Sequence, residues 1–329
     1  MRIVITGGHG FLGRAVCDEL LRRGGLAGQP ITEIVLADRA AGTEVPQARS
    51  VLGDLHETLP RVFAEPVDAV IHLAAAVSGE SEADLDLGLR ANVDLTRGVL
   101  DAARAQQAAG GPTVRLFFAS SVAVYGADAA LPLPDAVTEA TYPQPQNSYG
   151  AEKVVCEGLI ADYTRRGLID GRVARLMTVS VRPGKPNAAA SGFLSGIIRE
   201  PLAGVPAVCP VDPAQRVVIS SPRRTVEGII AMLEAERGTA SGQLTGRLPV
   251  NLPGLSVTVA DMIDGLRRVA GDAVADLVSV QRDPAIEAIV ADWPPRFDNT
   301  RAAALGLQPD ASIDSVIEQY LADHHSQTK

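Results

Sequence analysis

A phenol and an ammonium group stand four residues apart, at Tyr149 and Lys153. On a helix, side chains with this spacing lie on one face, a turn apart. Only three of the 30 basic residues are lysines, namely Lys153, Lys185 and Lys329. Because arginine does not replace the compact charge of a lysine, this pattern favours a chemical role for Lys153. The alternative interpretation is an exposed helical contact that contributes about 0.2–0.5 kcal/mol.

Ser121 ends a run of apolar residues, and Tyr149 opens the next amphipathic segment. In open α/β sheets, ligands bind at the carboxyl ends of the strands, so both side chains are expected in one crevice. There Tyr149 would accept a proton from a substrate hydroxyl, and Ser121 would orient the oxygen. Lys153 would favour the phenolate. The alternative role of Ser121 is to cap a turn.

The elements that carry these residues follow from the apolar pattern. Short runs rich in Val and Ile alternate with amphipathic stretches, which is typical of βαβ units and a parallel sheet. The sequence therefore predicts an α/β fold with a doubly wound parallel sheet of the Rossmann type. We expect strands at 2–6, 33–38, 68–75, 115–121 and 172–178, and helices at 11–23, 81–109 and 148–166, the last capped by Asn147 or Ser148.

The sequence pattern changes after Arg182-Pro183-Gly184. Beyond this point, short apolar runs no longer alternate regularly with amphipathic stretches. This change favours a second, smaller lobe made of discontinuous segments. We expect a nucleotide-binding domain at 1–180, to which 215–252 returns with a strand at 217–220 and a helix at 225–237. The smaller substrate lobe would comprise 181–214 and 253–329.

A glycine turn joins the first predicted strand to the first helix, as Gly7-Gly8-His9-Gly10-Phe11-Leu12-Gly13. Gly7 would allow a tight turn, Gly10 a close approach to a pyrophosphate, and Gly13 close packing of the helix on the strand. Phe11 and Leu12 open the helix, whose free N–H groups and dipole favour an anion. This strand, turn and helix context predicts a dinucleotide site rather than an ordinary loop.

Acidic and strand-end residues complete the predicted nucleotide site. Asp38 ends the second strand, where an acidic residue binds the ribose hydroxyls of NAD. Arg39 would instead accommodate the 2'-phosphate of NADP, so NAD is the preferred cofactor and NADP the alternative. Asp54 is a candidate for the adenine, although an ordinary turn aspartate has the same pattern. The strand end Leu73, Ala74 and Ala75 is expected beside the cofactor.

His72 lies inside that strand, and a metal role would require further ligands. The sequence has no second ligand at a suitable spacing, which favours a structural histidine. We expect no metal. The three cysteines, Cys17, Cys156 and Cys209, are widely spaced and odd in number, so they predict neither a disulfide framework nor a zinc site.

Composition narrows the class of partner. The formal net charge of −9 disfavours nucleic acid, since phosphate binding requires a basic field. Apolar runs such as residues 70–77 are far shorter than the roughly 20 residues that span a bilayer, so we expect no membrane. The chain begins directly with a strand pattern, without the features of a signal peptide. These features predict a cytoplasmic protein.

Taken together, the motifs resemble those of the extended short-chain dehydrogenases/reductases in the NAD-dependent epimerase/dehydratase family. The resemblance lies in TGGHGFLG, Asp38, HLAA, ANVDLT with Asn92, SSVAVYG, YGAEK, RPG and the segment from Asp298 to Pro309. It implies that Lys153 contacts the nicotinamide ribose and that Asn92 helps to order the cofactor site. It also implies a homodimer packed through the helices around 88–108 and 148–166.

The segment 181–204 resembles members of the family that oxidise small sugar acids. This likeness implies NAD-dependent oxidation of the C2 hydroxyl of D-erythronate to 2-dehydro-D-erythronate. A carboxylate substrate favours arginine partners, because the planar guanidinium binds two oxygens. The candidates are Arg182 and Arg216, with Lys185 and Asn187 nearby, and Ser78 and Thr178 for the hydroxyls.

The same residues help to distinguish among the other reactions of the family. Its sugar dehydratases carry an acid pair after the strand-end hydroxyl residue, where this chain has Val122 and Ala123. Dehydration is therefore disfavoured. A nucleotide-sugar 4-epimerase and a uronate dehydrogenase remain alternatives, because they need only the Ser121, Tyr149 and Lys153 set. A non-catalytic cofactor sensor is a third interpretation, but it has no use for that set.

Overall fold

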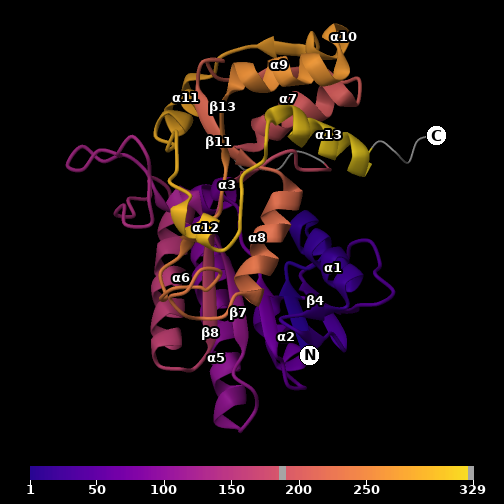
Figure 1. The fold of residues 1–329 in the computed structure, drawn as a ribbon, viewed down its shortest axis with the longest axis vertical. Helices are drawn as coiled ribbons and strands as arrows, with labels where there is room; N and C mark the ends of the chain where they lie inside the picture. The colour runs from indigo at the N-terminus through magenta and orange to yellow at the C-terminus, as the bar shows by residue number, and fades with distance from the viewer. Residues whose placement is uncertain (185–189, 325–329) are drawn as a thin grey trace.

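The computed structural model describes residues 1–184 and 190–324 (Figure 1). Seven parallel strands form the central sheet in the order β12-β8-β7-β6-β1-β4-β5. This doubly wound, Rossmann-type sheet confirms the predicted fold class. Its strands are β1 (Arg2–Thr6), β4 (Glu33–Asp38), β5 (Arg49–Leu52), β6 (Ala69–His72), β7 (Arg115–Ser121), β8 (Asp170–Leu176) and β12 (Val250–Asn251).

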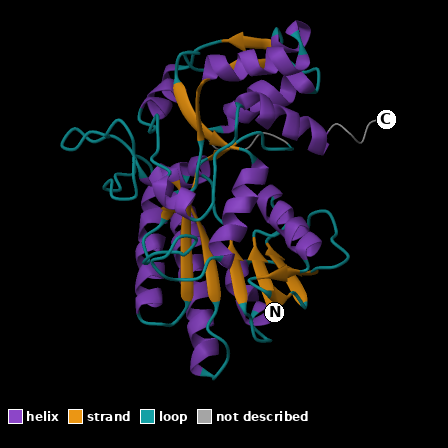
Figure 2. Cartoon of the chain, in the orientation of Figure 1, coloured by secondary structure: helices purple, strands orange, loops and turns teal. Residues whose placement is uncertain are grey.

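Helices cover both faces of this sheet, as Figure 2 shows. α1 (Phe11–Arg23) and α8 (Pro222–Glu234) pack on one face around an apolar core that includes Val16, Leu20 and Ile229. α2 (Leu55–Val62), α5 (Leu95–Ala108) and α6 (Ser148–Arg165) cover the other face. Burial on both faces explains why the inner strands read as continuous apolar runs. In the described part of the chain, no helix is long and apolar enough to cross a membrane.

The predicted helix at 81–109 is wrong in detail, because several elements share this range. They are α3 (Ser78–Ala83), α4 (Leu85–Gly88), the π-helix η1 (Leu89–Asp94) and α5. The break falls at Asp84, which has an extended backbone. Its side chain caps α4 by accepting the Leu87 N–H. An aspartate competes in this way with the helical backbone, so it favours a cap over a helix interior.

Two central elements escaped prediction, namely β5 and α2. β5 is an edge strand in which only Val51 is buried, so it lacks the apolar run of the inner strands. α2 contains Pro60, which argues against a helix when it is read from the sequence alone. The short hairpin of β2 (Gly25–Leu26) and β3 (Gln29–Pro30) also lies in this part of the chain.

The second lobe stands above the carboxyl ends of the strands (Figure 1). It contains the sheet β13-β11-β9, formed by β9 (Thr178–Val179), β11 (Arg216–Ser220) and β13 (Leu255–Thr258), and the pair β10 (Ala207–Cys209) and β14 (Val278–Val280). Its helices are α7 (Gly192–Leu202), α9 (Val259–Ala270), α10 (Asp272–Ala275), α11 (Pro284–Ala291) and α13 (Ile313–His324). α12 (Thr300–Ala304) lies against β12 instead.

One strand does not go where we expected it. The strand predicted at 217–220 is β11, and it joins β9 and β13 rather than the central sheet. The reason is that the chain leaves β8 and continues into β9, which offers its edge to β11 beyond the central sheet. Only α8 and β12 return to the central sheet from this region.

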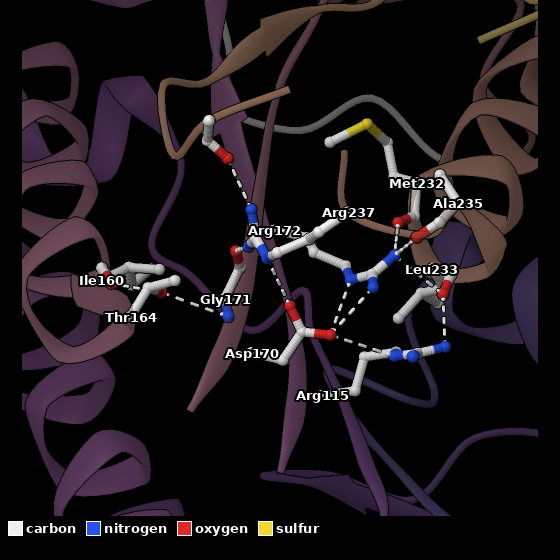
Figure 3. A network of polar contacts seen from close by, with 11 residues as sticks. Arg115, Ile160, Thr164, Asp170, Gly171, Arg172, Met232, Leu233, Ala235 and Arg237 are labelled. Atoms are coloured by element: carbon white, nitrogen blue, oxygen red, sulfur yellow. Dashed lines mark hydrogen bonds and ion pairs between the residues drawn. The ribbon is translucent and has the colours of Figure 1, made fainter. Parts of the chain in front are cut away.

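A buried arginine joins the end of α8 to the amino-terminal ends of β7 and β8 (Figure 3). Arg172 donates to the carbonyl oxygens of Met232 at 2.6 Å and Leu233 at 3.0 Å, and also to that of Ala235. The last carbonyls of a helix have no partner within it, so this guanidinium supplies one. Asp170 pairs with Arg172 at 2.8 Å. The contact lies at the opposite end of β8 from the carboxyl edge of the sheet.

Candidate active site

Doubly wound folds bind their ligands in a crevice at the point where the strand order reverses. In this sheet that point lies between β1 and β6. Gly7 leaves β1 with a φ of 69°, a conformation that favours glycine. A Cβ at Gly7 would lie 2.9 Å from the Ala74 nitrogen, so the glycine turn and the end of β6 are in direct contact. The structure therefore brings the turn together with Leu73, Ala74 and Ala75.

The amino end of α1 faces this crevice. Gly10 is the N-cap residue, and among the described residues no side chain caps the helix there. Phe11 and Leu12 form its first turn, and Gly13 packs against the backbone of Gly7 and Gly8. An uncapped helix start presents free N–H groups and a positive dipole end. The arrangement fits the pyrophosphate of a dinucleotide.

Asp38 lies beside the turn at the end of β4. Its carboxylate accepts the His9 N–H at 2.9 Å and the Ala40 N–H at 3.4 Å, and the residue is partly exposed. This place fits the predicted contact with a ribose. Asp54 has partners within the protein for both carboxylate oxygens. It caps α2 by accepting the His56 N–H, and it pairs with Arg90 at 2.7 Å. These contacts, chiefly the one from His56, lower the pKa of the Asp54 carboxyl.

His72 has the structural environment that the sequence predicts. Its Nδ1 lies 2.6 Å from the Thr6 hydroxyl and its Nε2 lies 3.0 Å from the Thr96 hydroxyl. Burial, with a smaller contribution from the Lys153 charge, lowers the pKa of His72 to about 3. Both ring nitrogens are therefore engaged, and the imidazole is neutral at physiological pH.

Tyr149 stands in the first turn of α6, which Asn147 caps by accepting the Gly150 N–H at 2.8 Å. Lys153 follows one turn later and is 3 % exposed. Its Nζ donates to the Ala119 carbonyl at 2.9 Å and lies 5.3 Å from the centre of the Tyr149 ring. The ammonium is thus fixed beside the phenol by the backbone of β7.

The first turn of α6 also meets the residues that follow β7. A Cβ at Gly150 would collide with the Ala123 carbonyl oxygen, so helix and strand end are in backbone contact. The Ser121 hydroxyl accepts the Ala123 N–H at 3.1 Å and so caps the short 3-10 helix η2 (Val122–Val124). The structure therefore brings the segment of Ser121 against the turn that carries Tyr149.

Asn92 lies in the π-helix η1, where it holds the loop after β6. Its Oδ1 accepts the Ala76 N–H at 2.8 Å, and its Nδ2 donates to Glu152 at 2.5 Å. Glu152 also accepts the Ser81 hydroxyl at 3.0 Å. This buried group orders the segment that leads from Ala75 to Ser78. π-helical turns are frequent at functional sites.

Arg182 follows β9 and is partly exposed. Burial lowers the pKa of Arg182, Tyr149 acts against this shift, and Arg199 adds to it. Its Nε donates to the Val179 carbonyl at 3.0 Å and its Nη2 to the Ser191 hydroxyl at 3.1 Å. Both acceptors are neutral, and no described carboxylate forms an ion pair with this guanidinium.

The remaining substrate candidates fall in different places. Thr178 lies two residues beyond β8, whose end pairs in register with Ser121, and Ser78 begins α3 after the β6 loop. Both therefore lie at the carboxyl edge of the sheet. Arg216 is exposed at the opposite end of β11 from the Thr178 pairing, near Ser256 at 3.5 Å, so it is not brought to the site. Lys185 and Asn187 lie outside the described residues.

Sequence reasoning missed the buried ion pair of Glu157 and Arg175. Glu157 stands one turn beyond Lys153 on α6, and Arg175 interrupts an apolar strand. Two signals were available, namely the repeat of four residues through Tyr149, Lys153 and Glu157, and a charge in a buried strand, which needs a partner.

Comparisons with known proteins agree with this geometry. The NAD dependent epimerase/dehydratase family matches residues 3–240. The chain is 49 % identical to D-erythronate dehydrogenase from Cupriavidus necator, with 98 % of both chains covered. It is 40 % identical to D-erythronate dehydrogenase from Haemophilus influenzae, over 98 % of this chain and 99 % of the relative.

A solved structure is similar over nearly the whole chain. The nucleoside-diphosphate-sugar epimerase from Agrobacterium tumefaciens has a TM-score of 0.90 and 37 % identity, covering 99 % of this chain and 95 % of the other. The likeness therefore extends through the central sheet and the second lobe.

Proposed function

Because the chain belongs to the NAD dependent epimerase/dehydratase family, we propose that it oxidises the C2 hydroxyl of D-erythronate to 2-dehydro-D-erythronate, with Tyr149 as the general base. The family and the two dehydrogenase relatives make the chain an NAD-dependent dehydrogenase that acts on a CH–OH group. The choice of a four-carbon acid, of C2 and of the base is the proposal.

The observation that carries the choice of substrate is Arg182, a partly exposed guanidinium that has no carboxylate partner among the described residues. A cation that is partly removed from water normally has a carboxylate or another strong acceptor beside it. Among the described residues Arg182 has neutral acceptors only, and the charge of Tyr149 acts against the lowering of its pKa by burial. A substrate carboxylate bound there would complete the pairing and hold the adjacent hydroxyl near the phenol.

The residues of the chain divide the chemistry as follows. Tyr149 takes the proton from the substrate hydroxyl, and the Lys153 Nζ is held 5.3 Å from the centre of its ring by the Ala119 carbonyl. Ser121 orients the reacting oxygen from the end of β7. The uncapped start of α1, Asp38 and the end of β6 would hold the cofactor. The chemistry that NAD would supply there is the acceptance of hydride from the substrate carbon.

A nucleotide-sugar 4-epimerase is the second candidate, and the similarity to the epimerase from Agrobacterium tumefaciens favours it. A uronate dehydrogenase of the same family would also use Tyr149. The partly exposed Arg182 supports an acid group on the reacting sugar, as in D-erythronate or a uronate, over the neutral hexosyl unit of a nucleotide sugar. An epimerase returns the hydride and forms no net NADH, so the two reaction classes are separable.

The test of the proposal compares two arginines and two substrates. Arg182→Ala should lower kcat/KM for D-erythronate by ~10²-fold, the cost of truncating one partner of a buried charge pair. For erythritol, which lacks the carboxylate, Arg182→Ala should change little. Arg216→Ala should leave both substrates unaffected, since that side chain is exposed away from the site. An equal loss on both substrates would refute the carboxylate contact.

We also propose a homodimer in the cytoplasm. Leu85, Leu87, Leu89 and Val155 are exposed apolar residues on α4, η1 and α6, which pack against one another. Such clusters support a protein interface.

All three cysteines are buried and free, and burial raises the pKa of the Cys17 thiol to about 11, which supports a protein without structural disulfides.

A further inference from the structure

We propose that the buried ion pair of Glu157 and Arg175 positions Ser121 against Tyr149. The inference rests on the proposed function, because it concerns the two hydroxyl groups assigned to the reaction. Neither Glu157 nor Arg175 is placed in contact with substrate or cofactor. They are positioning residues, which act by fixing the distance between the end of β7 and the start of α6.

The first half of the link runs from the helix to the strand. Glu157 lies on the same face of α6 as Tyr149 and Lys153, two turns and one turn away. It accepts the Ser120 hydroxyl at 2.5 Å and binds Arg175 through both carboxylate oxygens, at 2.9 and 2.7 Å. Ser120 directly precedes Ser121, so α6 is tied to the residue beside the reacting serine.

The second half runs from Arg175 to the segment after Ser121. The Arg175 Nη1 donates to the Tyr125 hydroxyl, and the guanidinium carbon lies 4.8 Å from the centre of the Tyr125 ring. The Tyr125 hydroxyl in turn lies 3.0 Å from the Thr138 carbonyl and 3.1 Å from Asn251 Oδ1. One guanidinium thus holds the helix of Tyr149 and both sides of Ser121.

Stability alone does not explain this pair. The Arg175 and Glu157 side chains are 4 % and 7 % exposed, and burying two charges costs desolvation energy that their attraction often fails to repay. A planar fork bound to two oxygens does fix orientation closely. The contact of Gly150 with the Ala123 carbonyl leaves no room between α6 and η2, so a shift of either element would move both hydroxyl groups.

The same strand offers a matched control. Arg172 stands at the other end of β8, is equally buried, and pairs with Asp170 while it caps α8 (Figure 3). Its loss should destabilise the fold without moving Ser121 or Tyr149. A comparison of the two arginines therefore separates a general cost in stability from a specific cost in positioning.

The experiment uses the full chain with three variants. Glu157→Leu with Arg175→Met replaces the pair by apolar residues, a change that often preserves stability. It should lower kcat by ~10²-fold, as a displacement of about 1 Å does, with KM and NAD affinity within about threefold of wild type. Arg172→Met should lower the melting temperature and leave the kcat of the folded enzyme unchanged. Tyr125→Phe, which keeps the ion pair, should lower kcat by about tenfold.

Hydrogen exchange supplies a readout that needs no substrate. Peptides covering 119–126 and 148–157 should exchange faster in the double variant than in wild type, whereas the α1 peptide should not. If wild type fails on D-erythronate, the proposed substrate falls, and exchange still tests the positioning role. A folded double variant, or Tyr125→Phe if the double variant does not fold, with wild-type kcat and exchange would overturn the inference.

Discussion

At the scale of single residues, the proposed function depends on two cations, Lys153 and Arg182. Lys153 lies on the same helix as Tyr149 and is bound to the Ala119 carbonyl, while Arg182 follows β9 in the second lobe. In the proposed reaction Lys153 holds its charge beside the phenol, and Arg182 offers a place for a negative substrate. Because proton transfer and binding of the substrate carboxylate would depend on different residues, each can be tested by a separate substitution.

Tyr149→Phe should lower kcat by ~10²-fold or more, because the proton acceptor is lost while the ring that fills the space is kept. NAD affinity, measured by calorimetry, should stay close to that of wild type. A variant that keeps its turnover within about tenfold would remove Tyr149 from the role of general base.

Asp38→Ala should weaken NAD more than NADP, since it removes the acceptor for the ribose hydroxyls and the repulsion of a 2'-phosphate. Asp38→Asn is the matched control, because it keeps an acceptor for the His9 N–H but not the charge. The measurement is the ratio of the two dissociation constants. An unchanged ratio in Asp38→Ala would contradict the ribose assignment.

His72 should make the fold sensitive to mild acid. Its pKa in the folded protein, about 3, is below the value of 6.5 in an unfolded chain, so the unfolded state binds the proton more readily. Stability is therefore complete above pH 6.5 and is lost as the pH falls toward 3. Between pH 7 and pH 5, urea unfolding should show a loss of about 2 kcal/mol in wild type that His72→Gln does not share. Parallel pH curves for the two proteins would contradict this explanation.

At the scale of elements, the sequence predicts what depends on apolar periodicity. β1, β4, β7, α1 and α6 lie where it placed them, and Tyr149 and Lys153 share a helical face as expected. It fails where tertiary contacts decide. The destination of β11 depends on the edge that β9 offers, and the division of the 81–109 segment depends on a cap at Asp84. The Glu157–Arg175 pair joins two segments whose contact no local pattern reveals.

Two glycines of α6 test whether the start of the helix is held against η2. Gly150→Ala should lower kcat by about tenfold and reduce stability by about 1–3 kcal/mol, since its Cβ meets the Ala123 carbonyl. Gly158→Ala should instead stabilise the protein by ~0.5–1 kcal/mol, because no atom lies within 4 Å of its Cβ. Similar effects at both positions would show that α6 is free to adjust.

At the scale of the whole molecule, the residues that we propose for the site come from both lobes. Ser121, Tyr149 and Lys153 belong to the central sheet and its helices, whereas Thr178 begins β9 of the upper sheet and Arg182 follows that strand. We propose that the boundary between the nucleotide-binding part and the substrate part falls near residue 180, and that α8 and β12, rather than the whole of 215–252, return to the nucleotide-binding part. The crevice between them is where a small acid would meet the cofactor.

The proposed dimer predicts a specific effect of charge on α6. Val155→Glu places a carboxylate in the exposed apolar cluster and should convert a dimer into a monomer in light scattering at micromolar concentration. Val208→Glu, at an equally exposed apolar residue on β10, should leave the dimer intact. A wild-type monomer would exclude the proposal.

The central claim is that this chain passes hydride from a four-carbon sugar acid to NAD. The most direct measurement is NADH absorbance when purified protein is incubated with NAD and D-erythronate, with D-threonate, hexuronates and UDP-hexoses as comparisons. We predict one NADH for each D-erythronate consumed and no net NADH from UDP-hexoses. Silence with D-erythronate, together with UDP-hexose conversion without net NADH, would contradict the account.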